Sequence, residues 1–502
     1  MVLAVTVFLV LLALAVPGAR AVVRRYATRT ESGTGLALFR MLYGVVLLCE
    51  VAQYLRGARL ISDPLPYLVP GSIAIESALV AWLAVILMLI CGLFTRAAAV
   101  ANYAFGIVFL SGLHGFEYHV DYILVGTNLL LIFAPVSRRL SLDARLRRTP
   151  PEPVSALWSR LFVFVGIALV YLDSVFYKWT SPMWTAGLGV WKPASVVHTT
   201  WVDLSPLLDL KWLMLGLGYA TLVFETLFPF LMWFDRLRWP LLGIGLGLHL
   251  GITLAFPIPW FGLTVVALYV LLVPPRVWDA LDRKLGVERD REATLHLPRT
   301  RLLAFTAVFA LFLFSQGASI IQSGVPRMLV GAGGTSPSWR TTTRLCQKYT
   351  GVFAQPYLGV TRHSVFMDHH FRGHEHIVTL VYVDSEGTET WLPLYKQNGQ
   401  VDPGNTGRFW VEWNFRVVGP RIDQDRLADG IRRRTAFWAR RNGVSLEDAR
   451  FRVLVKSIEI PGDEWEEGFL RRQLEQPWHE AGAAHWSRGE CRVTLAPIEA
   501  VP

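Results

Sequence analysis

The chain has 502 residues, of which 53% are hydrophobic, and its mean hydropathy is +0.37. Soluble domains are normally a little under half apolar, so this composition excludes an ordinary soluble enzyme and favours a protein that crosses a membrane several times. The net charge of +10 does not indicate nucleic-acid binding, because the basic residues lie in short clusters between apolar runs, as in cytoplasmic loops.

Apolar runs of bilayer length, about 17 to 25 residues, recur through the first two thirds of the chain. They predict about ten transmembrane helices, near residues 2–20, 35–55, 74–94, 97–113, 120–136, 157–177, 207–233, 238–257, 258–274 and 301–322. The first run has no positively charged leader and is followed by Arg24 and Arg25, which favours an uncleaved helix over a signal peptide.

The distribution of Lys and Arg between the runs predicts the orientation of a multi-pass protein in the cell membrane. If Arg24 and Arg25 are cytoplasmic, the cluster at 138–148 and the loop at 276–301 are cytoplasmic as well. The same alternation places the 178–211 loop and everything after residue 323 on the outer face.

After the last apolar run the pattern changes to short alternating segments, which are typical of strands. Residues 377–382 and 390–394 predict a hairpin around Ser385-Glu386-Gly387, and 425–441 predict a basic amphipathic helix. Further strands are predicted at 409–418, 452–460 and 492–497. The predicted fold class is therefore a multi-spanning α-helical membrane bundle with a C-terminal α+β extracytoplasmic domain. The predicted units are an N-terminal helix and link (1–33), a membrane domain (34–275), a cytoplasmic loop with the last helix (276–323), and the extracytoplasmic domain (324–502).

Four cysteines are too few for a disulfide scaffold. Cys49 and Cys91 fall inside apolar runs, where a thiol packs as a small hydrophobic group. Cys346 and Cys491 fall in the predicted extracytoplasmic domain, where they either form a disulfide or remain two unpaired thiols.

Lys178 at the outer end of the sixth apolar run is the first candidate for chemistry. An apolar pocket disfavours the charged form of a lysine, which makes its amine a candidate base. The alternative is a lysine that extends to the outer headgroups, as lysines at helix ends commonly do.

Asp173, Glu225 and His249 are further ionisable residues within the predicted spans. Such residues are costly in a bilayer, so each needs a partner inside the bundle and each is a functional candidate. Asp173 either holds a cation or joins two helices, and an interhelical hydrogen bond is the alternative role for His249.

Histidines cluster in Asp368-His369-His370 and His374-Glu375-His376 of the predicted outer domain. Alternate positions such as His374 and His376 point to one face of a strand, so His369, His370, His374 and His376 are candidate metal ligands. The alternative is a solvated hairpin tip that happens to be rich in histidine.

In chain order, several short motifs between residues 34 and 275 resemble the HTTM family, which includes the vitamin K-dependent gamma-carboxylases. The matching pieces are Leu38-Phe39-Arg40 with Tyr43-Gly44, Gly92-Leu93-Phe94-Thr95-Arg96, Ser141-Leu142-Asp143, the Tyr171 to Trp184 stretch with Gly187, Glu225 with Phe228-Pro229, Arg236 with Arg238, and His249-Leu250-Gly251-Ile252. The resemblance covers about half of the chain, and it rests on the order and spacing of these pieces.

The resemblance implies a carboxylase-like lyase or oxidoreductase in which Lys178 is the base that deprotonates a reduced quinone of the vitamin K type. His249 and Asp173 are then further catalytic candidates, and Tyr171, Trp184 and Glu225 are candidate cofactor-binding residues. The family histidine that precedes the Ser-x-Asp motif has no counterpart, because Arg138 and Arg139 occupy that region. An arginine cannot replace an imidazole in proton transfer, whereas His114 or His119 could supply one from the loop before the fifth span.

Three functions remain open from the sequence. The first is a lysine-base enzyme for a quinone or another lipid-soluble substrate at the outer face of the membrane. The second is a non-catalytic scaffold or transport-like module whose outer domain binds a partner protein or ligand. The third is a metal-dependent activity of the histidine cluster. Membrane lipid is an expected partner in each case, and nucleic acid is not.

Overall fold

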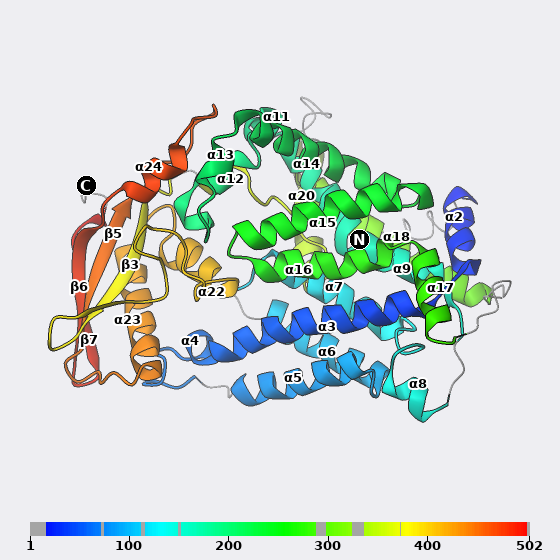
Figure 1. The fold of residues 1–502 in the computed structure, drawn as a ribbon, viewed down its shortest axis with the longest axis horizontal. Helices are drawn as coiled ribbons and strands as arrows, with labels where there is room; N and C mark the ends of the chain where they lie inside the picture. Colours follow the sequence, from blue (N-terminus) through cyan, green and yellow to red (C-terminus); the bar gives the residue numbers. More distant parts are fainter. Residues whose placement is uncertain are drawn as a thin grey trace.

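The computed structural model describes residues 17–71, 75–111, 116–148, 152–287, 298–323, 336–371 and 373–498. Figure 1 shows a bundle of long helices with a β-sheet at one end of the long axis and the short helices α2 (Pro17–Thr28), α8 (Leu142–Leu146) and α17 (Pro275–Lys284) at the other. The two ends are called here the sheet end and the basic end.

Five helical segments of the described chain are long and apolar enough to cross a membrane. They are α3 (Gly33–Arg56), the continuous segment Ala156–Lys178, α14 (Lys211–Leu231), the segment Asp235–Ala255 that contains α15 (Arg238–Ala255), and α18 (Arg299–Ile320). Segment Ala156–Lys178 consists of α9 (Ala156–Val163), η2 (Phe164–Ala168) and α10 (Leu169–Lys178). The bilayer-length runs of the sequence thus become helices, as predicted.

The expectation of ten crossings is not confirmed. A sixth span exists only if α16 (Pro259–Tyr269) and α17 are counted together, and these two helices are bent by 80°. Helices α5 (Ile75–Cys91) and α7 (His119–Phe133) are apolar but shorter, and α6 (Thr95–Gly106) continues into the π-helical turn η1 (Ile107–Ser111). Most of the run at 2–20 lies outside the described residues.

Short polar side chains determine where several helices begin. The Ser32 hydroxyl accepts a hydrogen bond from the Thr34 N–H at the start of α3, as an N-cap residue does. The Asp143 carboxylate accepts from the N–H groups of Phe94 and Thr95 at the start of α6, each at 2.8 Å. The acidic residue of the Ser-x-Asp motif therefore has a structural role, because it holds the first turn of α8 against the start of α6.

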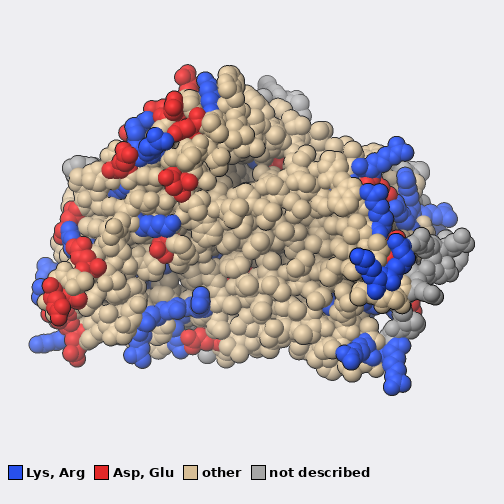
Figure 2. Space-filling model, in the orientation of Figure 1, with Lys and Arg blue, Asp and Glu red and all other residues tan. Residues whose placement is uncertain are grey.

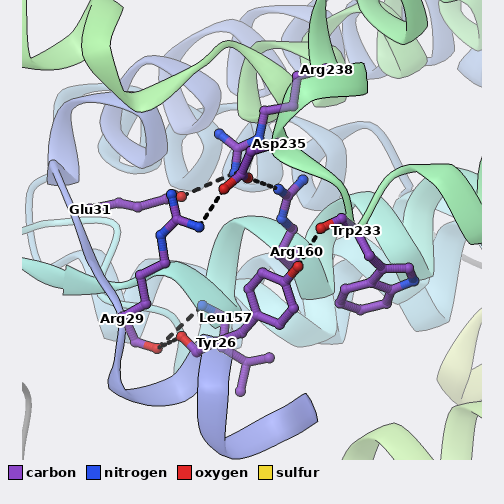
Figure 3. Close-up of polar contacts among 9 residues, drawn as sticks. Tyr26, Arg29, Glu31, Leu157, Arg160, Trp233, Asp235 and Arg238 are labelled. Carbon is purple, nitrogen blue, oxygen red and sulfur yellow. Dashed lines mark hydrogen bonds and ion pairs between the residues drawn. The ribbon is translucent and has the colours of Figure 1, made fainter.

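An ion-pair network holds the basic end together (Figure 3). The Asp235 carboxylate contacts Arg29, contacts Arg160 at 2.8 Å, and contacts Arg238 at 3.2 Å. Arg238 also reaches Glu31 at 3.1 Å, in the short strand β1 (Thr30–Glu31) that pairs with β2 (Val154–Ser155). Because three guanidinium groups share two carboxylates, this cluster carries an excess positive charge.

The charged residues of the surface gather at the two ends of the molecule, and the face between them is uncharged (Figure 2). Lys and Arg dominate the basic end, whereas both signs of charge are mixed at the sheet end. Large apolar side chains are exposed along the middle of the helices, such as Leu213, Val223 and Phe230 of α14 and Ile244 and Leu254 of α15. Exposed apolar surface of this extent between two polar ends is the pattern of a membrane protein.

The C-terminal part contains an antiparallel five-stranded sheet in the order β4-β3-β5-β6-β7. Its strands are β3 (His376–Val383), β4 (Glu389–Trp391), β5 (Arg450–Ser457), β6 (His479–Ser487) and β7 (Glu490–Leu495), and α23 (Gln424–Arg441) packs beside it. The predicted hairpin is confirmed, with Val381 opposite Trp391. The predicted helix at 425–441 is also confirmed.

Two predictions for this sheet were wrong. Residues 409–418 form α22 (Arg408–Val411) and the π-helical turn η8 (Glu412–Val417), because Phe409, Trp413 and Val417 are buried at a spacing of four, which places them on one helix face. Strand β6 was missed because its buried side chains are mostly small, as at Ala481 and Ala484.

The segment after the last span extends the helical bundle before the sheet begins. Helix α20 (Pro337–Tyr349) and the π-helical segment η7 (Thr350–Leu358) pack on α18 and α7. The Tyr349 hydroxyl lies 2.8 Å from the Ser315 hydroxyl of α18, and the Tyr103 hydroxyl donates to the Tyr357 carbonyl. All four cysteines have free thiols, so Cys346 and Cys491 are not joined.

One arginine from the C-terminal part binds two helices of the bundle. Arg408, at the start of α22, is buried, and its Nη2 lies 2.6 Å from Asp121 Oδ1 of α7 and 2.7 Å from Glu50 Oε1 of α3. The rings of Tyr54 and Tyr118 lie beside the guanidinium carbon, at 4.8 and 5.6 Å from their centroids. This Arg408 clamp attaches the sheet-containing part to the bundle through charge as well as packing.

Loss of the Arg408 side chain is expected to destabilise the protein strongly. In Arg408→Ala two carboxylates remain buried without their cation, and breaking a buried ion pair in this way costs about 3 to 5 kcal/mol. The melting temperature in detergent falls accordingly, and limited proteolysis separates the C-terminal part from the bundle. The control is Arg416→Ala, since Arg416 is half-exposed and lies 3.6 Å from its partner Glu117. Equal melting temperatures for the two variants would contradict the role of the clamp.

Candidate functional site

The candidate site is built where α10, α14 and the loop after α10 meet. Lys178 is the last residue of α10, and Glu225 lies on α14, which packs against α10. The loop approaches α14 closely, because a Cβ on Gly218 would lie 2.0 Å from the Gly187 carbonyl oxygen. Gly187 itself has a φ of +77°, a left-handed conformation that favours glycine. These two glycines allow the loop to hold Trp184 over the end of α10.

Lys178 is a paired lysine and not an isolated one. Its Nζ lies 2.6 Å from both carboxylate oxygens of Glu225 and 4.2 Å from the centre of the Trp184 ring. The side chains of Lys178 and Glu225 are each 8% exposed, so the pair is shielded from water. The sequence placed these three residues at one site, and the structure brings them into contact. The expectation of an unpaired amine in an apolar pocket was wrong, because Glu225 supplies a counter-charge.

Tyr171 lies two turns before Lys178 on the same face of α10, as a spacing of seven residues requires. Its hydroxyl lies 2.5 Å from His249 Nε2 of α15 and 2.8 Å from the Tyr269 hydroxyl of α16. The rings of Phe224 and Phe228 of α14 meet the Tyr171 ring edge to face. Tyr171 thus joins four helices, and His249 lies within electrostatic reach of Lys178.

Asp173 points to the other side of α10. Its carboxylate accepts hydrogen bonds from the Gln316 side-chain amide of α18 at 2.8 Å and from the His363 backbone N–H. These contacts match the alternative role in which Asp173 joins neighbouring segments. No hydrogen bond joins Asp173 to Lys178, although both are catalytic candidates from the sequence.

His363 is a site residue that the sequence did not reveal. It is buried in the loop after η7, its ring lies 5.7 Å from that of His119, and it is within electrostatic reach of Lys178. Burial, together with a smaller effect of the positive charge of Lys178, lowers the pKa of His363 to about 4. No motif marks this histidine, because it lies 185 positions after Lys178 outside every apolar run. His114, the other imidazole considered from the sequence, lies outside the described residues.

Two buried imidazole nitrogens near the pair have no hydrogen-bond partner among the described residues. They are His249 Nδ1 and His363 Nε2. A buried polar atom without a partner is rare and calls for one. On the face shown in Figure 2 the surface is hollowed where α14 and α15 approach α12 (Trp191–Ser195), and charged atoms are visible inside the hollow.

Arg138 takes no part in this site. It pairs with Glu152 at 2.7 Å near the start of the segment Ala156–Lys178, whereas Lys178 ends that segment. A helical segment of 23 residues is roughly 35 Å long at 1.5 Å per residue. The position of the family histidine, before the Ser-x-Asp motif, therefore lies at the opposite end of the bundle from Lys178.

The histidine cluster does not assemble into a ligand set within the described residues, which contain no group of three or more His, Cys, Asp or Glu that could hold a metal ion. His370 Nδ1 accepts the Met367 N–H, and His376 begins β3. His374 lies instead against His198 of η3 (Val197–Thr199), with ring centroids 5.0 Å apart. The side chain of His369 is outside the described residues, so the four-histidine site remains a prediction.

The His198–His374 contact is expected to make the protein sensitive to acid. Burial lowers the pKa of His374 to about 4 and holds the pKa of His198 well below its ordinary value of 6.5. Between about pH 6.5 and 4 the unfolded chain therefore binds protons that the folded chain does not, so stability falls as the pH decreases through this window. Melting temperatures near pH 7 and pH 5 measure the slope. His374→Gln is expected to reduce it, while His485→Gln, at a partly exposed site, leaves it unchanged. An unchanged slope in His374→Gln would contradict this assignment.

The fold and the site together define a membrane protein with a buried cluster of ionisable and aromatic side chains between its helices. The family model for the HTTM domain matches residues 28–278, which is half of the chain. The chain belongs to the HTTM family, and it is related to the vitamin K-dependent carboxylases through that family. No curated protein and no solved structure matches it significantly.

Proposed function

We propose that this HTTM protein is a membrane enzyme in which Lys178 is the base toward a lipid-soluble substrate of the quinone class. The observation that carries the proposal is the buried Lys178–Glu225 pair, which lies beside two imidazoles with unpartnered nitrogen atoms. In the proposed orientation the basic end is cytoplasmic, and the pair and the C-terminal domain are on the outer side of the membrane.

The Lys178–Glu225 contact permits base chemistry in spite of the counter-charge. An ammonium with a carboxylate and a neutral amine with a carboxylic acid contain the same number of protons. Moving one proton across the 2.6 Å contact to Glu225 leaves a neutral Lys178 amine. Lys178 is then the proton acceptor, and Glu225 stores the proton that Lys178 has given up.

The surroundings of the pair fit a flat molecule with polar oxygen atoms. His249 Nδ1 and His363 Nε2 would hydrogen-bond to such oxygens, and the Trp184 ring supplies an aromatic surface. A reduced quinone of the vitamin K type would supply an acidic hydroxyl group at this position. In the family an imidazole precedes the Ser-x-Asp motif, where this chain has Arg138. His363 would supply that imidazole here.

A second candidate function is a membrane scaffold whose outer domain binds a partner. The observation that favours it is that Glu225 and Trp184 occupy two sides of the Lys178 amine, as in a contact that only joins helices. In that case the pair is replaceable by neutral side chains without loss of function. The two candidates thus make opposite predictions for one double variant.

The double variant Lys178→Met with Glu225→Gln is expected to fold normally and lose activity. It removes both charges together, so neither is left buried alone, and replacement of a buried ion pair by neutral groups is often tolerated. Loss of a general base lowers the rate by about 10²- to 10⁴-fold. The measurement is consumption of a reduced naphthoquinone by the full chain in lipid nanodiscs, with native mass spectrometry for a co-purifying quinone.

The matched control is Lys192→Met, because Lys192 is also buried and paired, with Asp463 at 2.8 Å, but lies on α12. It is expected to retain quinone consumption. Equal activity of the wild type and the double variant, at equal melting temperature, would leave the scaffold as the better description. A wild type that neither binds nor consumes a quinone would also contradict the enzyme proposal.

A further inference from the structure

Arg40 is a buried cation without an ion-pair partner in the described part of the chain. It is fully buried in α3, and its guanidinium group donates only to backbone carbonyls, at Val136 (2.8 Å), Leu140 (2.5 Å) and Ile90 (3.3 Å). Asp143 attracts it from a distance, but that carboxylate is bonded to the start of α6. A buried charge is normally paired, so this arginine needs a negative charge nearby.

A cavity of about 450 Å³, open to the surface, lies against the segment that binds Arg40, although Arg40 itself does not line it. Leu140, whose carbonyl oxygen binds Arg40, lines the cavity, and so does Cys91, which follows Ile90 at the end of α5. The complete lining is Cys91, Arg138, Arg139, Leu140, Ser141, Leu142, Ala144 and Arg145. Its volume is within the range of small-molecule sites, and its wall contains arginines but no carboxylate.

The arginines of the cavity wall are not fully neutralised by the protein. Arg138 pairs with Glu152 at 2.7 Å and Arg139 with Asp282 at 2.9 Å. Arg145 makes no ion pair with any described residue, and it is exposed. Arg145 and the buried Arg40 behind the cavity wall therefore have no carboxylate in contact among the described residues. Their positive charge favours an anionic ligand in the cavity.

The position of the cavity points to a lipid as the source of that anion. The cavity lies at the basic end, where Lys and Arg dominate the surface (Figure 2), and α5 is an apolar helix that ends at it. A headgroup at this level has its acyl chains beside the exposed apolar face of α5, with Val80 and Leu87. Basic pockets between helices at the membrane surface bind the phosphate groups of anionic lipids.

We propose that the Arg138–Arg145 cavity binds the phosphate headgroup of an anionic glycerophospholipid, such as phosphatidylglycerol. The site is independent of the Lys178 pair, which lies at the other end of the bundle on α10 and α14. Its lipid stabilises the contact between α5, α6 and α8 by compensating the charge of Arg145 and of Arg40 behind the cavity wall.

The test is native mass spectrometry of the delipidated full chain in detergent, titrated with phosphatidylglycerol or phosphatidylcholine of the same acyl composition. The wild type is expected to retain phosphatidylglycerol and to bind phosphatidylcholine much more weakly. Arg145→Gln is expected to weaken phosphatidylglycerol binding about fivefold, the effect of one basic residue near an anionic membrane surface. Arg147→Gln is the matched control, since Arg147 is also exposed on this loop but does not line the cavity.

Specific outcomes separate this site from general charge attraction. Equal losses in Arg145→Gln and Arg147→Gln, or equal binding of the two lipids by the wild type, would overturn the proposal. Displacement of phosphatidylglycerol by millimolar inorganic phosphate would identify a free-phosphate site and overturn the lipid assignment. Because Arg145 is exposed, the variant keeps the wild-type melting temperature without lipid, and added phosphatidylglycerol raises that of the wild type more than that of the variant.

Discussion

The requirement that every charge inside an apolar bundle be neutralised by a partner determines how this chain is assembled. Five helices and the C-terminal part are held by buried pairs of opposite charge, at Lys178–Glu225, at Arg238–Glu31 and at the Arg408 clamp. In an apolar interior the loss of hydration opposes each of these contacts, so each survives only where good geometry and further hydrogen bonds accompany it. The pairs therefore specify which helices are neighbours as much as they stabilise the fold.

The same requirement makes the Lys178 region unusual. The pair is neutral as a unit, yet it lies among tyrosines and imidazoles whose hydrogen-bonding atoms are only partly used. Unpartnered polar atoms also occur among the described residues at the other buried pairs, as at the Tyr54 hydroxyl beside the Arg408 clamp and at Arg238 Nε. The Lys178 region differs because two buried imidazoles lie within electrostatic reach of its lysine. Ionisable groups gathered inside an apolar helical bundle mark a candidate functional site.

Hydropathy and local pattern were sufficient to predict much of the fold, because bilayer-length runs such as 157–177 and 301–322 have few alternatives to helix. Hydropathy and local pattern could not predict how many of these helices cross a membrane, because α5 is almost as long as the helices that could span one. The partner of Lys178 is 47 positions away, and His363 is brought to the site by tertiary packing alone. The helix at Arg408–Val417 was predicted to be a strand because aromatic and β-branched residues are typical of strands. Only the spacing of its buried side chains, which the structure reveals, indicates a helix.

The Arg408 clamp also orders the events of biogenesis. Its two carboxylates come from α3 and α7, within the first quarter of the chain, whereas the guanidinium group is synthesised only after the last long helix. Glu50 and Asp121 therefore lack their cation until the late segment has been made. A chain that stops before Arg408 would leave two buried acids uncompensated, so the early helices reach their final packing only once the C-terminal part is present.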